Sequence, residues 1–205
     1  MSDNNRMVFI VDDDDAVRDS LSFLMKSIGI ESRGFASATE FLEFYDDKIA
    51  GCLVLDIRMP GMSGLELQDQ LNEINAILPI IFITGHGDVP MAVEALKKGA
   101  LDFIQKPFRD QDLIDRINHA LDQDHDSRNI LSEKREILDR MDQLTNREKE
   151  VMELVVQGNP NKIIAADLDV SQRTVEIHRA RVMEKMRARS LAQLVRMSIT
   201  ANSDL

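Results

Sequence analysis

The chain has 205 residues, of which 43% are hydrophobic, and it carries a formal net charge of −11. This length suffices for one large or two small domains with apolar cores. No apolar run approaches the ~18 residues of a membrane span, the N-terminal MSDNNRM lacks the apolar stretch of a signal peptide, and the single Cys52 excludes an internal disulfide. We therefore expect a soluble, cytoplasmic protein without a membrane partner.

The charge is distributed unevenly along the chain. Residues 1–121 hold 11 basic and 21 acidic residues, whereas residues 144–205 hold 10 basic and 8 acidic ones. Within residues 171–196 there are 7 basic residues and only 2 acidic ones. An acidic front half joined to a back half with a basic face indicates a nucleic-acid partner for the back half only.

The front half alternates strand and helix patterns. Apolar runs typical of strands lie at residues 8–11, 53–55, 80–83 and 103–104, with a weaker run near 30–35. Asp14 is suited to cap a helix after the first run, and Leu113, Ile117 and Leu121 form the apolar stripe of the last helix. Strands that are apolar throughout and separated by helices indicate a parallel sheet covered on both faces.

Polar residues follow four of these strands. Asp12 and Asp13 follow the first run, Asp56 follows the run at 53–55, Thr84 follows the next, and Lys106 follows the last. Because the carboxyl ends of parallel strands meet along one edge, three acids, a hydroxyl and an ammonium should share one cleft. Taken alone, the run of four aspartates has a second interpretation, a solvated turn with a helix cap.

The three acids, the hydroxyl and the ammonium of this expected cleft are suited to phosphoryl transfer. Converging carboxylates suit Mg²⁺, which prefers oxygen ligands. A bound cation would neutralise Asp12 and Asp13 and leave Asp56 able to attack a phosphoryl group. Lys106 and Thr84 could then hold the phosphoryl oxygens.

The segments IVDDDDAVRDSL, CLVLDIRMPGMSGLEL and IIFITGHGDVPMAVEALKKGALDFIQKPF resemble, in this order and spacing, the receiver domain of a two-component response regulator, over about residues 6–122. The resemblance implies a doubly wound α/β fold with strand order 2-1-3-4-5, an order already known for this kind of domain. It makes Asp56 the phosphoacceptor, with Thr84 and Lys106 contacting the phosphoryl group. It also implies that Thr84 and Phe103 form the switch, and that Mg²⁺ or Mn²⁺ is held by Asp12, Asp13, Asp56 and the backbone carbonyl of Arg58.

Some of these residues have a second interpretation. Lys106 could be a solvated surface lysine, but its place before Pro107, where a cis bond would form a tight turn, favours the site. Thr84 could instead cap the turn at residues 85–87. We expect the loop residue His86 to be solvated or hydrogen-bonded rather than a metal ligand.

The back half shows the pattern of four short helices. Thr145 and Glu148 have capping-box spacing, and Gly158 ends the helix that follows. A second helix is expected at 161–168, a third from the cap Ser171 to about residue 187, and a fourth after residue 190. Two short helices joined by a tight turn have helix-turn-helix geometry, in which the second helix enters the DNA groove.

A helical wheel divides this reading helix into two faces. Val175, Val182 and Met186 fall together and should be buried, with His178 alongside. The other face holds Arg173, Glu176, Ile177, Ala180, Arg181 and Arg187. A solvated face is the alternative, but cations together with small or apolar side chains favour a helix lying in the major groove.

The segment LTNREKEVMELVVQGNPNKIIAADLDVSQRTVEIHRARVMEKM resembles the LuxR-type DNA-binding domain, an all-α four-helix fold, over residues 144 to about 200. Its signature residues are Thr174, Val175, His178 and Lys185. With a receiver in front, the chain is similar to FixJ-like transcriptional regulators. The resemblance directs Glu176, Ile177 and Ala180 to base edges, although Glu176 departs from the frequent basic residue there. It directs the following side chains mostly to phosphates: Asn161, Lys162, Arg173, Thr174, Arg181 and Lys185.

We therefore expect a receiver at 1–122, a helical linker at 123–143 and a DNA-binding domain at 144–205. The linker lacks Pro and Gly. Its heptad spacing of Ile130, Ile137 and Leu144 allows either a coiled coil or packing against one of the domains.

The predicted function is transcription control through phosphorylation of Asp56 by a histidine kinase. Phosphorylation would promote formation of a homodimer that binds double-stranded promoter DNA and, we expect, RNA polymerase. The chain would not be an enzyme, except that the receiver assists its own phosphoryl transfer and dephosphorylation. A phosphatase is disfavoured because Arg58 stands where haloacid-dehalogenase-type enzymes have a second acid. Intact Asp13, Asp56, Thr84 and Lys106 disfavour a phosphorylation-independent binding module.

Overall fold

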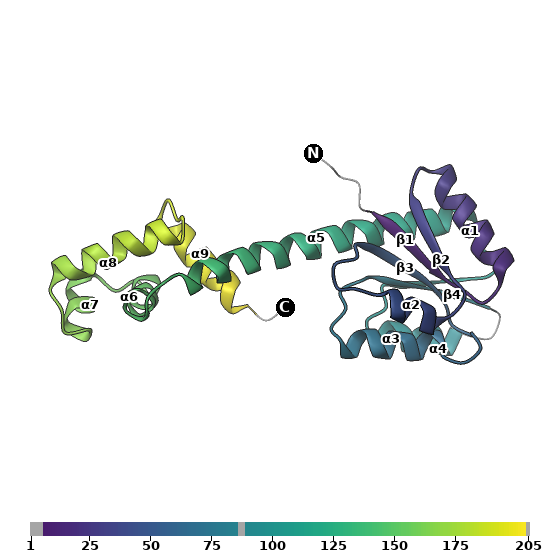
Figure 1. Cartoon of the computed structure of the whole chain (residues 1–205), viewed down its shortest axis with the longest axis horizontal. Coiled ribbons are helices and arrows are strands. Elements are labelled where there is room, and N and C mark those ends of the chain that lie inside the picture. Colours follow the sequence, from purple (N-terminus) through teal and green to yellow (C-terminus); the bar gives the residue numbers. More distant parts are fainter. Residues whose placement is uncertain (1–5, 86–88, 204–205) are drawn as a thin grey trace. The chain divides into compact units, whose positions relative to one another are not determined.

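The computed structural model describes residues 6–85 and 89–203 and divides the chain into two compact units, Met1–Arg128 and Asn129–Leu205. Each unit contains a hydrophobic core of its own. The first unit contains strands and helices, and the second is built of helices (Figure 1). None of the helices in these ranges is long and apolar enough to cross a membrane.

The first unit is built on a five-stranded parallel sheet. Its strands are β1 (Met7–Val11), β2 (Glu31–Phe35), β3 (Gly51–Asp56), β4 (Ile80–Thr84) and β5 (Asp102–Gln105), in the spatial order β2-β1-β3-β4-β5. The predicted parallel sheet and its strand order are therefore confirmed.

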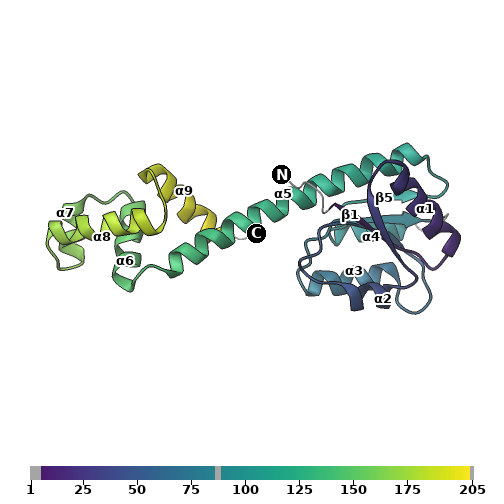
Figure 2. The same cartoon turned by 45° about the horizontal axis from the view of Figure 1, so that its top comes forward.

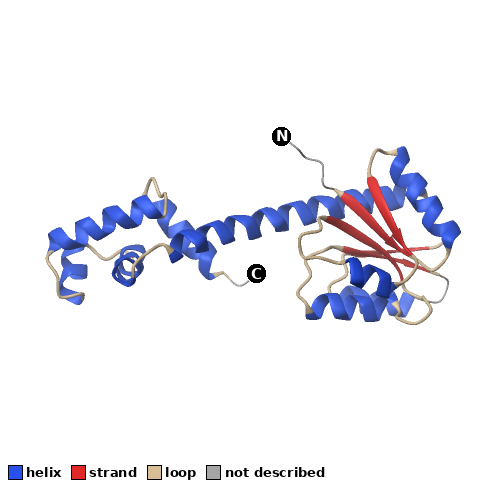
Figure 3. Cartoon of the chain, in the orientation of Figure 1, coloured by secondary structure: helices blue, strands red, loops and turns tan. Residues whose placement is uncertain are grey.

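Helices cover both faces of this sheet (Figure 3). They are α1 (Asp15–Ser27), α2 (Ala38–Phe44), α3 (Gly64–Glu73), α4 (Val89–Lys97) and α5 (Asp110–Asp142). Phe9 of β1 packs in the core under α2, α3 and α4, while its neighbour Ile10 packs under α1 and α5. Since successive strand side chains point to opposite faces, both faces must be apolar. This explains the uninterrupted apolar runs in the sequence.

Helix α5 continues through the segment predicted as a linker. Asp124, on its part in the first unit, accepts a hydrogen bond from Gly51 N at 2.9 Å and pairs with Arg128. In the second unit, Ile137 is buried in the core, whereas Ile130 is 51% exposed. The predicted heptad residues therefore have different environments. Of the two alternatives, a coiled coil or packing against a domain, Ile137 shows the packing against a domain.

The second unit consists of the end of α5 and four short helices, α6 (Asn146–Val156), α7 (Asn161–Asp167), α8 (Gln172–Lys185) and α9 (Leu191–Asn202) (Figure 2). Thr145 forms the predicted capping box with Glu148, and Ser171 and Ser190 cap α8 and α9. The four predicted helices are thus confirmed.

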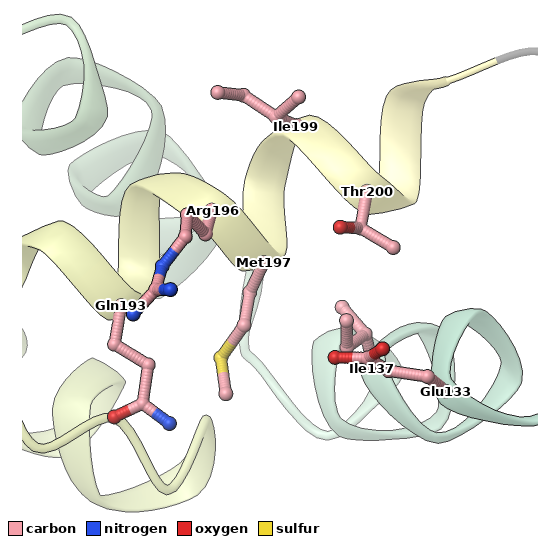
Figure 4. A pocket seen from close by; sticks show the side chains of 7 residues that line it. All are labelled: Glu133, Ile137, Gln193, Arg196, Met197, Ile199 and Thr200. Carbon is pink, nitrogen blue, oxygen red and sulfur yellow. The ribbon is translucent and has the colours of Figure 1, made fainter. Parts of the chain in front are cut away.

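A hollow of about 350 Å³ lies in the second unit between α9 and the end of α5. Met197 from α9 and Ile137 from α5 extend toward it (Figure 4). Ile199, also at its rim, is 64% exposed.

Candidate functional site

Three polar residues from the carboxyl ends of β1, β3 and β5 meet in the first unit. Nζ of Lys106 lies 3.1 Å from Oδ2 of Asp12 and 3.2 Å from Oδ1 of Asp56. The Asp12 side chain is 4% exposed, that of Asp56 13%, and that of Lys106 32%. The predicted convergence of these residues at one sheet edge is therefore present.

The turn after β1 holds Asp12 in a fixed orientation. Its Oδ1 accepts a hydrogen bond from Asp14 N at 2.9 Å, and its backbone carbonyl accepts one from Nη1 of Arg18 at 2.6 Å. Asp14 caps α1 by accepting a hydrogen bond from Ala16 N at 2.9 Å. Asp13 points into solvent. The last two residues of the aspartate run begin the helix as predicted, whereas the place of Asp13 in the site stays a prediction.

Asp56 is positioned by the loop between β3 and α3. Its Oδ2 accepts a hydrogen bond from Arg58 N at 2.7 Å. Gly64, the first residue of α3, approaches so closely that a Cβ atom there would lie 2.2 Å from the carbonyl oxygen of Asp56. A side chain at this position would therefore displace either α3 or the Asp56 backbone.

Burial and the neighbouring opposite charge shift the pKa values of Asp56 and Lys106 in opposite directions. Burial raises the pKa of Asp56, aided by the Asp12 carboxylate and opposed by Lys106 and Arg58 N. For Lys106, burial acts to lower the pKa, but attraction to Asp12 and Asp56 outweighs it and the pKa is raised. Lys106 is therefore a cation at neutral pH, held against the carboxylate that it partly neutralises.

Thr84 and Phe103 lie on adjacent strands. Thr84 is fully buried, and within the described ranges its Oγ1 has no hydrogen-bond partner. Its carbonyl accepts a hydrogen bond from Lys106 N at 2.7 Å. Phe103 is half-buried against the core under α2, α3 and α4. The predicted cis bond between Lys106 and Pro107 is present.

The turn that Thr84 could cap, and His86 within it, lie outside the described residues, apart from residue 85. The capping alternative for Thr84 therefore stays a prediction.

The donors at this edge are carboxylate oxygens. The described residues contain no group of three or more His, Cys, Asp or Glu side chains already arranged around one point. Asp12 and Asp56 nevertheless converge on a single cationic group, the Lys106 ammonium. Hard oxygen donors of this kind fit Mg²⁺, which uses few protein ligands and retains several waters.

The second unit presents the predicted faces of α8. Val175, Val182 and Met186 are buried. His178 is half-buried, with an Nδ1 atom that has no hydrogen-bond partner among the described residues. The following residues are all exposed, as predicted: Arg173, Glu176, Ile177, Ala180, Arg181 and Arg187.

Two of the other residues predicted to contact phosphates lie at the surface of this unit. Lys162 of α7 is exposed. Thr174 is half-exposed, and its hydroxyl shares a 2.8 Å hydrogen bond with that of Ser171.

Lys185 has partners inside the second unit. Its Nζ lies 2.6 Å from Oε2 of Glu148 and donates to the carbonyl of Gln143 at 3.0 Å. Glu148 is only 2% exposed, and its pKa is lowered to about 2 by the hydrogen bond from Lys185, with a further contribution from Thr145 N. The pattern Thr-x-x-Glu predicted the cap but not this ion pair, because the partner lies 37 residues further along the chain.

One interaction between α7 and α8 is absent from the sequence prediction. Nη1 of Arg179 donates to Oδ1 of Asn161 at 2.9 Å and joins α8 to α7. The helical wheel gave no signal for it, because Arg179 belongs to neither predicted face.

Comparison with known proteins assigns both units. The model of the response regulator receiver domain matches residues 8–118, and that of the luxR family of bacterial regulatory proteins matches residues 142–198. Nodulation protein W of Bradyrhizobium diazoefficiens is 48% identical over 194 residues, covering 95% of this chain and 86% of that protein. The transcriptional regulatory protein FixJ of Rhizobium meliloti is 49% identical over 192 residues, covering 94% of each chain.

A solved structure of the response regulator StyR superimposes with a TM-score of 0.87 at 44% identity, covering 95% of this chain and 98% of that one. The likeness therefore extends over both units. The chain belongs to the family of transcriptional response regulators that join a receiver domain to a LuxR-type DNA-binding domain, as FixJ does.

Proposed function

We propose that Asp56 is the residue that accepts the phosphoryl group, and that a sensor histidine kinase supplies it. The observation that carries this is the contact of the Asp56 carboxylate with Lys106, whose ammonium also contacts Asp12. The nucleophile is 13% exposed and therefore reachable, while the cation beside it can attract the phosphoryl oxygens.

A divalent cation, Mg²⁺ or Mn²⁺, would be held by Asp12, Asp13, Asp56 and the carbonyl of Arg58. When bound, it would supply positive charge that offsets the repulsion between carboxylates and phosphoryl oxygens. Lys106 supplies charge from the other side, and the Thr84 hydroxyl, buried without a partner among the described residues, is available to bind a phosphoryl oxygen. Phe103, on the adjacent strand β5, is the second residue of the proposed switch. The phosphoryl transfer that this domain assists is confined to its own Asp56.

The second unit binds double-stranded promoter DNA through α8 and the start of α7, in the cytoplasm, and acts on RNA polymerase. Arg173, Arg181, Thr174, Asn161 and Lys162 contact phosphates, and Glu176, Ile177 and Ala180 face base edges. The ion pair with Glu148 argues against assigning Lys185 to a phosphate, because reaching DNA would leave a buried carboxylate unpaired. We assign Lys185 to holding α8 against α6 instead.

Labelling with a small-molecule phosphodonor in the presence of Mg²⁺ tests the phosphoacceptor. Wild-type protein should form an acid-stable, alkali-labile acyl phosphate, and Asp56→Asn should form none. Asp69→Asn, which changes a half-exposed carboxylate on α3 that pairs with Lys98, is the matched control and should label normally. Undiminished labelling of Asp56→Asn would remove Asp56 from this role.

A further inference from the structure

Arg179 is a half-buried residue in the middle of α8, between the buried and exposed faces of that helix. The only hydrogen bond of its side chain among the described residues is the 2.9 Å contact from Nη1 to Oδ1 of Asn161. Asn161 begins α7 and is followed by the exposed Lys162. The arginine thus contacts a side chain that lies beside a proposed phosphate-binding lysine.

The chemistry of the two groups determines how the amide is turned. A guanidinium can only donate hydrogen bonds, so Asn161 must present its oxygen to Arg179. The amide nitrogen, with two hydrogens to donate, is then directed elsewhere. Within the described parts of the chain, Nδ2 of Asn161 has no acceptor. An unused donor beside an exposed lysine is suited to bind an anion.

The neutrality of Asn161 supports the same conclusion. A carboxylate at this position would hold the guanidinium more strongly, because both partners of the hydrogen bond would be charged. It would also present negative charge, and no donor, to an approaching phosphate. An amide is weaker as a tether but retains a donor group for DNA.

We propose that Arg179 is a positioning residue for DNA binding, which holds the Asn161 amide so that Nδ2 donates to a backbone phosphate. This rests on the proposed function, namely that this surface of α7 and α8 binds DNA. Arg179 acts through Asn161 and does not itself contact the phosphate. Arg181, two residues away on the exposed face of the same helix, contacts a phosphate directly.

Salt dependence separates these two roles. A cationic side chain at a phosphate releases counterions, so its removal lowers the slope of log K against log salt by about 1. Asn161 is neutral, so losing its contact weakens binding without changing that slope. Arg179→Met should therefore behave like Asn161→Ala and unlike Arg181→Met.

The experiment uses the full chain, phosphorylated with a small-molecule phosphodonor and Mg²⁺, and a fluorescent mixed-sequence duplex of about 30 base pairs, with anisotropy measured from about 50 to about 200 mM KCl. We expect Arg179→Met and Asn161→Ala each to weaken binding about three- to tenfold, as expected for one lost hydrogen bond. The double variant should bind no more weakly than either single one. Arg179→Lys, which retains a donor, should recover part of the affinity.

Thermal unfolding of each variant excludes a purely structural effect. Asn161→Asp keeps and strengthens the tether to Arg179, so it should be at least as stable as wild type yet bind weakly. The proposal is overturned by unchanged binding of Arg179→Met or Asn161→Asp, by additive losses in the double variant, or by a lower salt slope for Arg179→Met. A failure of the proposed function would give a different result. In that case the wild type would not bind the duplex, and Arg181→Met and Lys162→Ala would not change its binding.

Discussion

Nζ of Lys106 lies 3.2 Å from Oδ1 of Asp56, so the residue after β5 reaches the last residue of β3 across the intervening strand β4. The same ammonium contacts Asp12, the residue after β1. One cation therefore connects three strand ends of the sheet. The carboxylate proposed to accept the phosphoryl group is held beside the charge that would attract its substrate.

The two halves of the aspartate run should respond differently to mutation. Asp13→Ala removes a proposed metal ligand that is exposed, so metal-dependent labelling by a small phosphodonor should be lost while the fold survives. Asp14→Ala removes only the cap of α1 and should label normally, at a cost of about 1 kcal/mol in stability. Labelling and thermal unfolding measure the two effects, and full labelling of Asp13→Ala would contradict the metal assignment.

Protonation of Glu148 in acid should weaken its pair with Lys185 and so lower the stability of the second unit. The pKa of Glu148 is lowered from 4.5 to about 2, so its contribution to stability is complete above about pH 4.5 and is lost as pH falls toward 2. Glu148→Gln should destabilise the unit by about 1–3 kcal/mol near pH 7, because Lys185 and Thr145 N lose a charged hydrogen-bond acceptor. Urea denaturation should show this difference from wild type shrinking below pH 4.5.

Glu150→Gln is the matched control for that experiment. Glu150 lies on the same helix and pairs with Arg147, but its side chain is 50% exposed. Exposed pairs contribute little, so this variant should stay within about 0.5 kcal/mol of wild type near pH 7. Equal losses in the two variants would contradict the special role of the Glu148–Lys185 pair.

Variants of the proposed DNA-binding surface should fall into two groups, one that changes affinity and one that changes sequence preference. Arg181→Ala and Lys162→Ala should weaken binding about equally on all duplexes and lower the salt slope, because both residues are proposed to contact phosphates. Glu176→Ala and Ile177→Ala should instead change which base pairs are preferred. Selection from a random duplex pool measures the preference. If all four variants changed affinity alone, the proposed orientation of α8 would be wrong.

Phosphorylation should change the oligomeric state. A module of this size buries limited surface on one half-site, so specific binding generally requires two modules one DNA turn apart. We expect a mainly monomeric unphosphorylated protein and a phosphorylated dimer, paired through α4 and β5, with α9 also able to pair on DNA. This population shift requires the phosphoryl group to favour the dimer-competent state. Sedimentation with and without phosphodonor measures it, and Asp56→Asn should remain monomeric.

A fragment without the receiver should bind DNA without phosphorylation, and we expect that such a fragment must begin near residue 129 to fold. Ile137 and Leu144 are 2% and 5% exposed within the core of the second unit. A 129–205 fragment should unfold cooperatively and bind the duplex. A 144–205 fragment lacks Ile137, and loss of such a side chain from a core costs about 2–5 kcal/mol. We propose that the acidic receiver, which carries 21 acidic and 11 basic residues over 1–121, repels DNA and inhibits binding by the unphosphorylated chain. A 129–205 fragment that is folded yet inert on DNA would refute this role.

Much of the receiver fold and its site followed from local patterns. Apolar runs bounded by helices fixed the strands, and parallel strands place their carboxyl ends on one edge. Asp12, Asp56 and Lys106 could therefore be assigned to one cleft from their positions after strands. The capping box at Thr145 and the faces of α8 were predictable for a similar reason, since both depend on residues within a few helical turns.

Contacts between distant residues depended on the tertiary structure. Lys185 meets Glu148 only because α6 and α8 pack together, and Arg179 meets Asn161 only because α7 and α8 cross at the turn. Sequence periodicity describes one helix at a time and carries no information on which side chain of another helix lies opposite. The ion pair of Lys185 and the contact of Arg179 with Asn161 therefore become visible only once the helices are packed together, and both proposed roles of these residues depend on that packing.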